Sequence, residues 1–282
     1  GALPGENFEE KGRDIEEGLK AAKLLEEAGY DSFNVDVGSY DAWYWSHPPV
    51  YQDYGVALPY IKKLKKIVKI PIIVAGKLGK PALAQQVLIE GKADIVALGR
   101  PLLADPYWPK KILGGKEEEI KPCLGCHDGC MGRGFNGNPL SCAVNPDCGR
   151  EEEYKIFKTN KAKNVLIVGG GISGMEAARV AALRGNDVIL YEKKKELGGH
   201  LLEASVPDFK RDEIDLLRWY KNVLKKHNIK INLNENVSPD MVKKINPDTL
   251  IIATGSTPIT LNVPGINKKY VAQATDILLG KR

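Results

Sequence analysis

The sequence has 282 residues, of which 43% are hydrophobic and 27% charged, an ordinary composition for a folded chain with room for about two domains. Its 41 Lys and Arg and 36 Asp and Glu are interspersed, so the net charge of +5 forms no basic stripe and nucleic-acid binding is not expected. No apolar run approaches the roughly 20 residues that cross a bilayer, and the first residues lack a leader pattern. We therefore expect a cytoplasmic protein without a membrane segment.

Helical spacing of apolar residues alternates with short apolar runs in the first part of the chain. The expected elements are, in order, a helix over 14–28, a strand over 33–37, a helix over 57–69, a strand over 71–75, a helix over 81–90 and a strand over 94–98. Strands separated by helices pair in parallel, so this region is predicted to be α/β, either an open sheet or part of a (β/α) barrel.

Two of these strand ends carry a glycine followed by a cation: Gly76-Lys77 and Gly99-Arg100. In (β/α) barrels the carboxyl ends of the strands form the active site, and the last loops often bind phosphate. The glycine N–H groups and the two cations would suit the phosphate of FMN. The alternative is that both cations are solvated loop residues.

All five cysteines lie between Cys123 and Cys148, in a segment over 115–150 that lacks periodicity. Such clustering indicates a local site rather than a disulfide framework. Two, three and eleven residues separate Cys123, Cys126, Cys130 and Cys142, and Gly125, Gly129 and Gly132 would relieve the backbone around a centre.

Four thiolates suit either a zinc ion or a [4Fe-4S] cluster, and spacing alone does not decide between them. The cluster is favoured because a cofactor-binding domain follows in the chain. Cys148 is expected to be a buried, inert thiol, with replacement of Cys142 as fourth ligand as the alternative. His127 is expected to be a surface residue.

The second α/β region begins with a strand over 165–168, followed at once by Gly169-Gly170-Gly171-Ile172-Ser173-Gly174. This G-x-G-x-x-G turn, a helix over 172–184 and Glu192 at the end of the next strand predict a dinucleotide site. Gly169 would allow the tight turn, Gly171 the approach of a pyrophosphate and Gly174 close packing of helix and strand. A helix over 212–227 and strands over 229–233 and 249–253 are also expected.

Glu192 is followed by Gly198-Gly199, and much later comes Ala253-Thr254-Gly255. This combination resembles the flavoproteins with two dinucleotide-binding domains, whose FAD domain carries an E-x(5)-G-G run and an A-T-G strand end. The resemblance favours FAD over NAD at the glycine turn.

Several runs resemble the old-yellow-enzyme-related NADH:flavin oxidoreductases, a group that includes 2,4-dienoyl-CoA reductase, trimethylamine dehydrogenase and 2-enoate reductase. They are 91–106, Cys123-Leu124-Gly125-Cys126, 141–146 and the glycine turn, in that order. The run over 38–49 looks most like 2-enoate reductase.

The resemblance implies four segments: 1–114, the last three strands of a (β/α)8 TIM barrel that holds FMN; 115–150, a [4Fe-4S] segment; 151–162, a linker; and 163–282, an incomplete Rossmann-like FAD domain without its NADH domain. It also implies electron flow from NADH to FAD, through the cluster to FMN, and on to an activated C=C bond.

The resemblance carries roles onto individual residues. The cluster ligands fall on Cys123, Cys126, Cys130 and Cys142, and FMN contacts fall on Lys77, Gly99 and Arg100. FAD contacts fall on Gly169, Gly171, Ser173, Gly174, Glu192, Gly199, His200, Lys210 and Val237. Tyr40 occupies the place of a histidine that activates the substrate in the dienoyl-CoA reductases, so it is the candidate catalytic residue.

We therefore expect a fragment of a longer ene-reductase acting on a 2-enoate, inactive alone, and either homo-oligomeric or completed by the missing parts of the same enzyme. Alternative substrates are a 2,4-dienoyl-CoA, a bile-acid or steroid enone, or an amine. The alternative of another class is an electron-transfer or zinc-stapled binding module without a substrate of its own.

Overall fold

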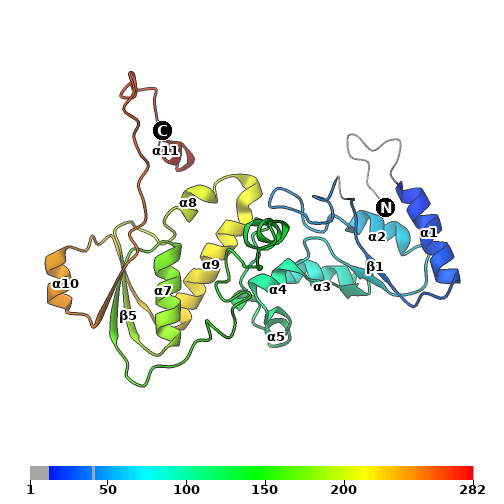
Figure 1. Cartoon of the computed structure of the whole chain (residues 1–282), viewed down its shortest axis with the longest axis horizontal. Helices are drawn as coiled ribbons and strands as arrows, with labels where there is room; N and C mark the ends of the chain where they lie inside the picture. The colour runs from blue at the N-terminus through cyan, green and yellow to red at the C-terminus, as the bar shows by residue number, and fades with distance from the viewer. Residues whose placement is uncertain (1–12, 40–41, 282) are drawn as a thin grey trace. The chain divides into compact units, whose positions relative to one another are not determined.

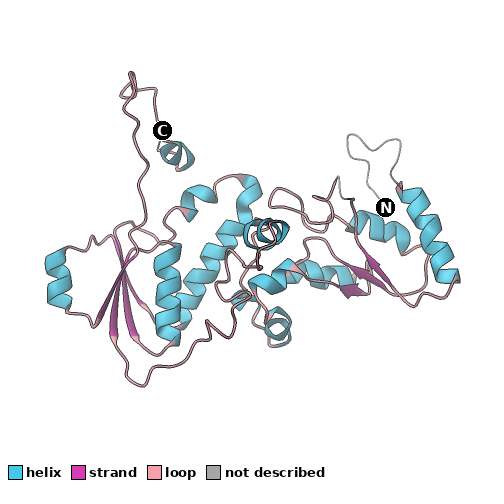
Figure 2. Ribbon diagram, in the orientation of Figure 1, coloured by secondary structure: helices cyan, strands magenta, loops and turns pink. Residues whose placement is uncertain are grey.

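The computed structural model of the chain describes residues 13–39 and 42–281. It divides into two compact units, Gly1–Arg150 and Glu151–Arg282. Each unit contains a parallel sheet with helices (Figure 1 and Figure 2). The predicted α/β class is therefore confirmed, whereas the finer division into four segments stays a prediction.

The sheet of the first unit contains β1 (Phe33–Val35), β2 (Ile72–Val74) and β3 (Ile95–Val96), all parallel and in chain order. The helices α2 (Leu58–Leu64) and α3 (Pro81–Ile89) make the two crossovers. Strands that follow one another in both sequence and space, each joined by a helix, have the connectivity of a (β/α) barrel segment.

Local sequence explains where the first helices begin and end. In α1 (Ile15–Glu27), the side chain of Asp14 accepts a hydrogen bond from Glu17 N at 2.7 Å, and Gly29 follows the helix with a φ of +98°. Pro81 opens α3 at a position where a missing N–H costs nothing. The helix expected over 57–69 is shorter, because the chain after Leu64 continues in turns.

The core of the first unit lies between its helices and its sheet. It contains the fully buried side chains of Ile61, Ile72, Val74, Leu78 and Val87. The apolar residues predicted at helical and strand spacing supply this core, and their burial is what holds the short strands together.

Short helical turns connect this sheet to the cysteine segment and continue within it. They are α4 (Arg100–Ala104), α5 (Trp108–Leu113), a 3-10 turn (Glu117–Glu119), a π-helical turn (Asp128–Gly132) and α6 (Arg133–Phe135). Buried Asp105 accepts hydrogen bonds from Tyr107 N at 3.1 Å, Lys121 N at 2.8 Å and Lys111 Nζ at 2.5 Å. This carboxylate therefore anchors the chain just before the first cysteine.

The sheet of the second unit has the order β6-β5-β4-β7, with all strands parallel. The strands are β4 (Asn164–Val168), β5 (Asp187–Glu192), β6 (Lys230–Leu233) and β7 (Thr249–Ile252). Counted along the chain this is the order 3-2-1-4 of a doubly wound dinucleotide-binding fold. In Figure 1, α7 (Ile172–Leu183) lies beside the sheet, with α9 (Arg211–Lys226) next to it.

The remaining helices of the second unit are short: α8 (Leu201–Ala204), a 3-10 turn (Asp208–Lys210), α10 (Pro239–Ile245) and α11 (Ala274–Leu278). A long loop separates β7 from α11 (Figure 2). Within 13–39 and 42–281, the chain has no helix with the length and apolar character that a bilayer crossing requires.

Candidate cofactor sites

The four cysteines that the sequence singled out come together in the first unit. Cys123, Cys126, Cys130 and Cys142 line one pocket, with Arg100 and Leu103 of α4 on its wall. Cys148 is buried and is not among the residues that line this pocket. The structure thus brings together the set predicted as cluster ligands and leaves the fifth thiol outside it.

Glycines make the cysteine loop possible at two close approaches. A Cβ on Gly129 would lie 2.7 Å from Ser141 O, and Ser141 N donates to Gly129 O at 2.9 Å. This backbone contact sets Cys130 beside Cys142. Gly125 has a φ of +65°, and a Cβ there would lie 3.2 Å from Val50 N. The predicted relief of the backbone therefore occurs at these two glycines, whereas Gly132 is helical, with a φ of −61°.

The spacing of the donors bears on which metal group would fit. Among the residues that the structure describes, no three His, Cys, Asp or Glu side chains are arranged to hold one metal ion. Zinc needs four donors about 2.3 Å from a single centre, whereas a cluster core is larger and holds its thiolates farther apart. The four thiols that share this pocket are the soft donor set that both groups take.

Burial favours the protonated form of two of the thiols in this pocket. It raises the pKa of Cys123 to about 11 and also raises the pKa of Cys126. Metal binding requires thiolates, so loading this pocket with a metal group releases protons.

His127 joins the cysteine loop to the rest of the unit. Its backbone is left-handed, with a φ of +62°, and Arg100 Nη1 contacts its Nε2. Its ring stacks on Trp43, with ring centroids 6.2 Å apart. Burial, and then the charge of Arg100, lowers the pKa of His127 to about 4, so the ring is neutral and accepts from the guanidinium. His127 is therefore half-buried and structural rather than the expected surface residue.

The two cations at the strand ends converge on one loop. Lys77 Nζ donates to Pro49 O at 3.1 Å, Val50 O at 2.9 Å and Gln52 O at 2.6 Å, and Arg100 Nη1 donates to Pro48 O at 2.9 Å. Gly99 has open space where a Cβ would lie. Lys77 is thus directed to backbone carbonyls in this conformation, and the roles of Lys77, Gly99 and Arg100 toward FMN stay predictions.

In the glycine turn of the second unit, Gly169 and Gly174 are needed for close packing, whereas Gly171 leaves space for a ligand. A Cβ on Gly169 would lie 2.2 Å from Ala253 O, and one on Gly174 would lie 1.9 Å from Gly169 O. At Gly171 the nearest atom would be Gly199 Cα at 3.8 Å, an ordinary contact. The protein itself therefore leaves room beside Gly171, where a pyrophosphate would approach the start of α7.

Glu192 lies at the end of β5, as predicted, and it is buried. Its Oε2 accepts from Gly170 N at 2.6 Å and its Oε1 accepts from Lys194 N at 2.8 Å. Each carboxylate oxygen has a further lone pair, so these bonds leave capacity for ribose hydroxyls. The same bonds fix the glycine turn to the end of β5.

The other predicted FAD residues lie on several different elements of the second unit. Ser173 lies in the first turn of α7, and His200 Nε2 is 3.0 Å from Ser256 O. Lys210 immediately precedes α9, and Val237 lies in the loop after β6. Their roles stay predictions. Tyr40 lies outside the described residues.

Two acidic residues near these sites escaped the sequence analysis. Asp36 directly follows β1, and burial raises its pKa. Glu203 is buried on α8, three residues after His200. A carboxylate at a strand end or at helical spacing from a candidate histidine is a weak signal, because exposed acids are common in both places.

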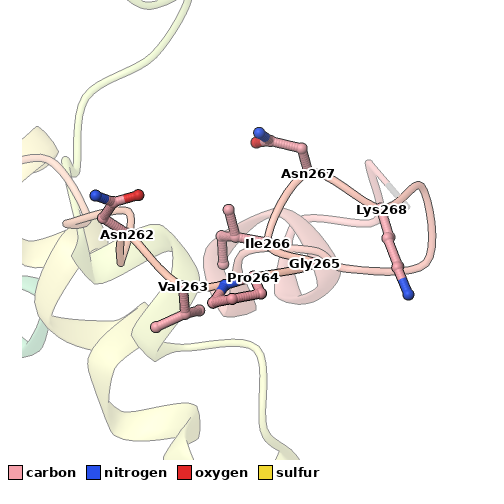
Figure 3. A pocket seen from close by; sticks show the side chains of 7 residues that line it. All are labelled: Asn262, Val263, Pro264, Gly265, Ile266, Asn267 and Lys268. Carbon is pink, nitrogen blue, oxygen red and sulfur yellow. The ribbon is translucent and has the colours of Figure 1, made fainter.

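A separate pocket of about 530 Å³ in the second unit is lined by Asn262–Lys268 alone (Figure 3). The side chains of Asn267 and Lys268 point away from the turn. None of the predicted site residues lines it.

Comparisons with known proteins match two successive parts of the chain to two families. Residues 4–119 match the NADH:flavin oxidoreductase / NADH oxidase family, and residues 163–281 match the pyridine nucleotide-disulphide oxidoreductase family. The fold, the glycine turn and both family matches together define the class. The sequence resembles flavin-dependent oxidoreductases in its first module and pyridine-nucleotide oxidoreductases in its second.

Individual relatives agree with this class. Cinnamate reductase of Clostridium sporogenes is 52% identical over the whole chain, which covers 42% of that relative. NADH oxidase of Thermoanaerobacter brockii is 40% identical over 98% of the chain and 43% of the relative. A 2-naphthoyl-CoA reductase in complex with 2-naphthoyl-CoA is 37% identical, with a TM-score of 0.91 over 95% of this chain and 41% of that one.

The predicted resemblance to the NADH:flavin oxidoreductases is thus confirmed for the first part of the chain, and the second part matches the pyridine nucleotide-disulphide oxidoreductases. The partial barrel and Rossmann-like fold predicted from it are confirmed as well. The chain spans about two-fifths of the length of the relatives that it matches.

Proposed function

We propose that this chain is the central part of an NADH-dependent ene-reductase, in which electrons pass from FAD through a [4Fe-4S] cluster to FMN and reduce the C=C bond of a 2-enoate. The convergence of the four predicted cysteines on one pocket is the observation that carries the proposal. The substrate class is supported by the 52% identity to a cinnamate reductase, because cinnamate is an α,β-unsaturated carboxylate.

Each group would be held by residues of one unit. Cys123, Cys126, Cys130 and Cys142 would bind the cluster as thiolates, and the open side of Gly171 with Glu192 would receive the dinucleotide. When bound, the flavins supply hydride chemistry and the cluster supplies one-electron transfer.

The protein contributes a preorganised setting for the cluster. Gly129 and Ser141 fix the cysteine loop through their backbones, and Arg100 is the one formally charged residue among those that line the thiol pocket. A cation there lowers the cost of placing four thiolates in one place.

Metal and sulfide analysis of the purified chain tests the cluster. After anaerobic reconstitution we expect four irons and four acid-labile sulfides per chain, about the stoichiometry of one [4Fe-4S] centre, with a broad absorbance band near roughly 400 nm. Cys142→Ala should lose most of this iron, whereas the control Cys148→Ala should retain it, because Cys148 does not line the pocket. One zinc without sulfide would instead favour the zinc-stapled module.

Substrate class is tested on the whole protein that contains this sequence. We expect NADH oxidation with cinnamate or a simple 2-enoate to exceed that with enoyl-CoA esters, steroid enones or amines. A clear preference for a thioester would move the assignment toward the CoA reductases, which the likeness to the 2-naphthoyl-CoA reductase makes the second candidate.

A further inference from the structure

Glu203 is a buried carboxylate that lacks a full set of partners. Its residue exposure is 6%, and its Oε2 has no hydrogen-bond partner within the described part of the chain. A lysine and a histidine flank it: Lys194 Nζ is 3.8 Å from Oε1, and His200 Nδ1 is 3.7 Å from Oε2. Burying such an oxygen unpaired is costly, so its position calls for a compensating role.

His200 extends from Glu203 to another segment of the same unit. Its Nε2 lies 3.0 Å from Ser256 O and 3.4 Å from Ser256 Oγ. Ser256 follows β7, whereas His200 follows the Gly198-Gly199 turn. A Cβ on Gly199 would lie 2.9 Å from Gly171 Cα, so His200 emerges directly beside the glycine turn that follows β4.

The strand order identifies this place as the crevice of the fold. The chain runs from β4 to β5 and then β6 on one side of β4, and returns to form β7 on the other side of β4. The strand order therefore reverses between β4 and β7. Ligands of doubly wound sheets bind at the carboxyl ends of the strands at such a point. His200 therefore connects the two walls of the predicted dinucleotide crevice.

Lys194 links Glu203 to Glu192 at the end of β5. The backbone N–H of Lys194 donates to Glu192 Oε1 at 2.8 Å, and its ammonium faces Glu203. Glu203 thus lies beside Lys194, whose backbone holds Glu192, and beside His200, which spans the crevice. A single buried carboxylate can orient both groups at once.

We infer that Glu203 is a positioning residue that holds His200 across the crevice and thereby retains the ADP-containing dinucleotide. This inference rests on the proposed function. Nδ1 of His200 faces Glu203 and Nε2 faces Ser256, so the ring is held in one orientation across the crevice, beside Gly171 where the pyrophosphate would lie. Glu203 itself does not need to touch the ligand.

Titration of the full chain with FAD tests this inference, with flavin fluorescence as the readout. We expect Glu203→Gln and His200→Gln each to weaken binding about tenfold, or 1.4 kcal/mol. The double variant should be no weaker than either single variant, because both changes break one unit. Asp208→Asn, which alters a carboxylate that is 97% exposed, is the matched control and should bind as the wild type does.

His200→Lys provides a second measurement at an exposed side chain that does not endanger folding. A lysine can donate to Ser256 O and pair with Glu203, so it should recover most of the affinity lost in His200→Gln. If the wild type binds FAD but the two losses add in the double variant, the inference is wrong and the proposed function stands. The same holds if Glu203→Gln binds FAD as the wild type does. A folded wild type that binds no FAD would overturn the proposed function, and the inference with it.

Discussion

Gly171 and Gly174 lie in one turn, yet a methyl group at each would meet different surroundings. Gly174→Ala places its Cβ 1.9 Å from Gly169 O, and Gly169 cannot retreat because its own Cα faces Ala253 O. Alanine gains about 1 kcal/mol in helix propensity, but overpacking costs about 1–3 kcal/mol, so the clash dominates. We expect Gly174→Ala to lower the free energy of unfolding, measured in urea.

Gly171→Ala should separate binding from stability. Its Cβ would lie 3.8 Å from the nearest atom, so the free energy of unfolding should fall by no more than about 1 kcal/mol, the cost of a poorer helix N-cap. The methyl group would occupy the space left for a pyrophosphate, so FAD affinity should fall by about tenfold or more. Unchanged affinity in a folded Gly171→Ala protein would argue against a dinucleotide at this turn.

Glu192 has a structural role that its predicted ribose contact does not reveal. It is buried and accepts from Gly170 N and Lys194 N. Glu192→Gln places an amide N–H₂ group against one of these donors, so we expect a loss of about 2 kcal/mol in the free energy of unfolding. Glu235→Gln, on an exposed side chain of the same unit, is the control for the urea titration. An unaltered midpoint in Glu192→Gln would show that the carboxylate bonds are dispensable.

Asp94 connects three elements of the first unit. It immediately precedes β3, pairs with Lys65 just after α2, and accepts from Ile72 N at the start of β2 at 2.8 Å. The hydrogen bond from Lys65, and then that from Ile72, lowers the pKa of Asp94. A pKa that is lower in the folded state stabilises the protein above the unfolded value of about 3.9, and this contribution disappears as the pH falls through the folded value.

Asp94→Asn should therefore matter at neutral pH and not in acid. We expect a loss of about 1 kcal/mol at pH 7, at the low end for a charged hydrogen bond because 38% of the side chain is exposed. Below about pH 3 the wild type and the variant should converge in urea midpoints. Asp31→Asn, which alters an exposed carboxylate before β1, should show no such pH-dependent difference.

Periodicity in the sequence predicted every strand of both sheets and their long helices, because each buries a regular apolar face. It missed α4, α5, α6, α8, α10 and α11, each of which has at most seven residues, or about two helical turns. It also predicted which thiols form a set, since close spacing confines Cys123, Cys126 and Cys130 to one loop. It could not show that Gly125 packs on Val50 or that Arg100 contacts His127, because these contacts join residues far apart in the chain.

The proposed function assigns different cofactor groups to the two units of the chain. One unit contains the thiol pocket and the strand ends that resemble an FMN site, and the other contains the dinucleotide turn. If the two flavins of the proposed function are too far apart to exchange electrons directly, a carrier is needed between them. The cysteine segment, which lies between the modules in sequence, is the candidate carrier.

Cys142→Ala in the whole protein tests this division of labour. NADH should still bleach the flavin bound at the glycine turn, because Cys142 takes no part in that site, whereas reduction of the 2-enoate by NADH should fall to the background without enzyme. Chemical reduction of the other flavin should restore reduction of the 2-enoate, since the barrel site is intact. Rapid-scan absorbance resolves the steps, with Cys148→Ala as the control. If NADH still drove full reduction of the 2-enoate in Cys142→Ala protein without iron, the two flavins would have to exchange electrons directly, and the cysteine segment would serve only to hold the fold.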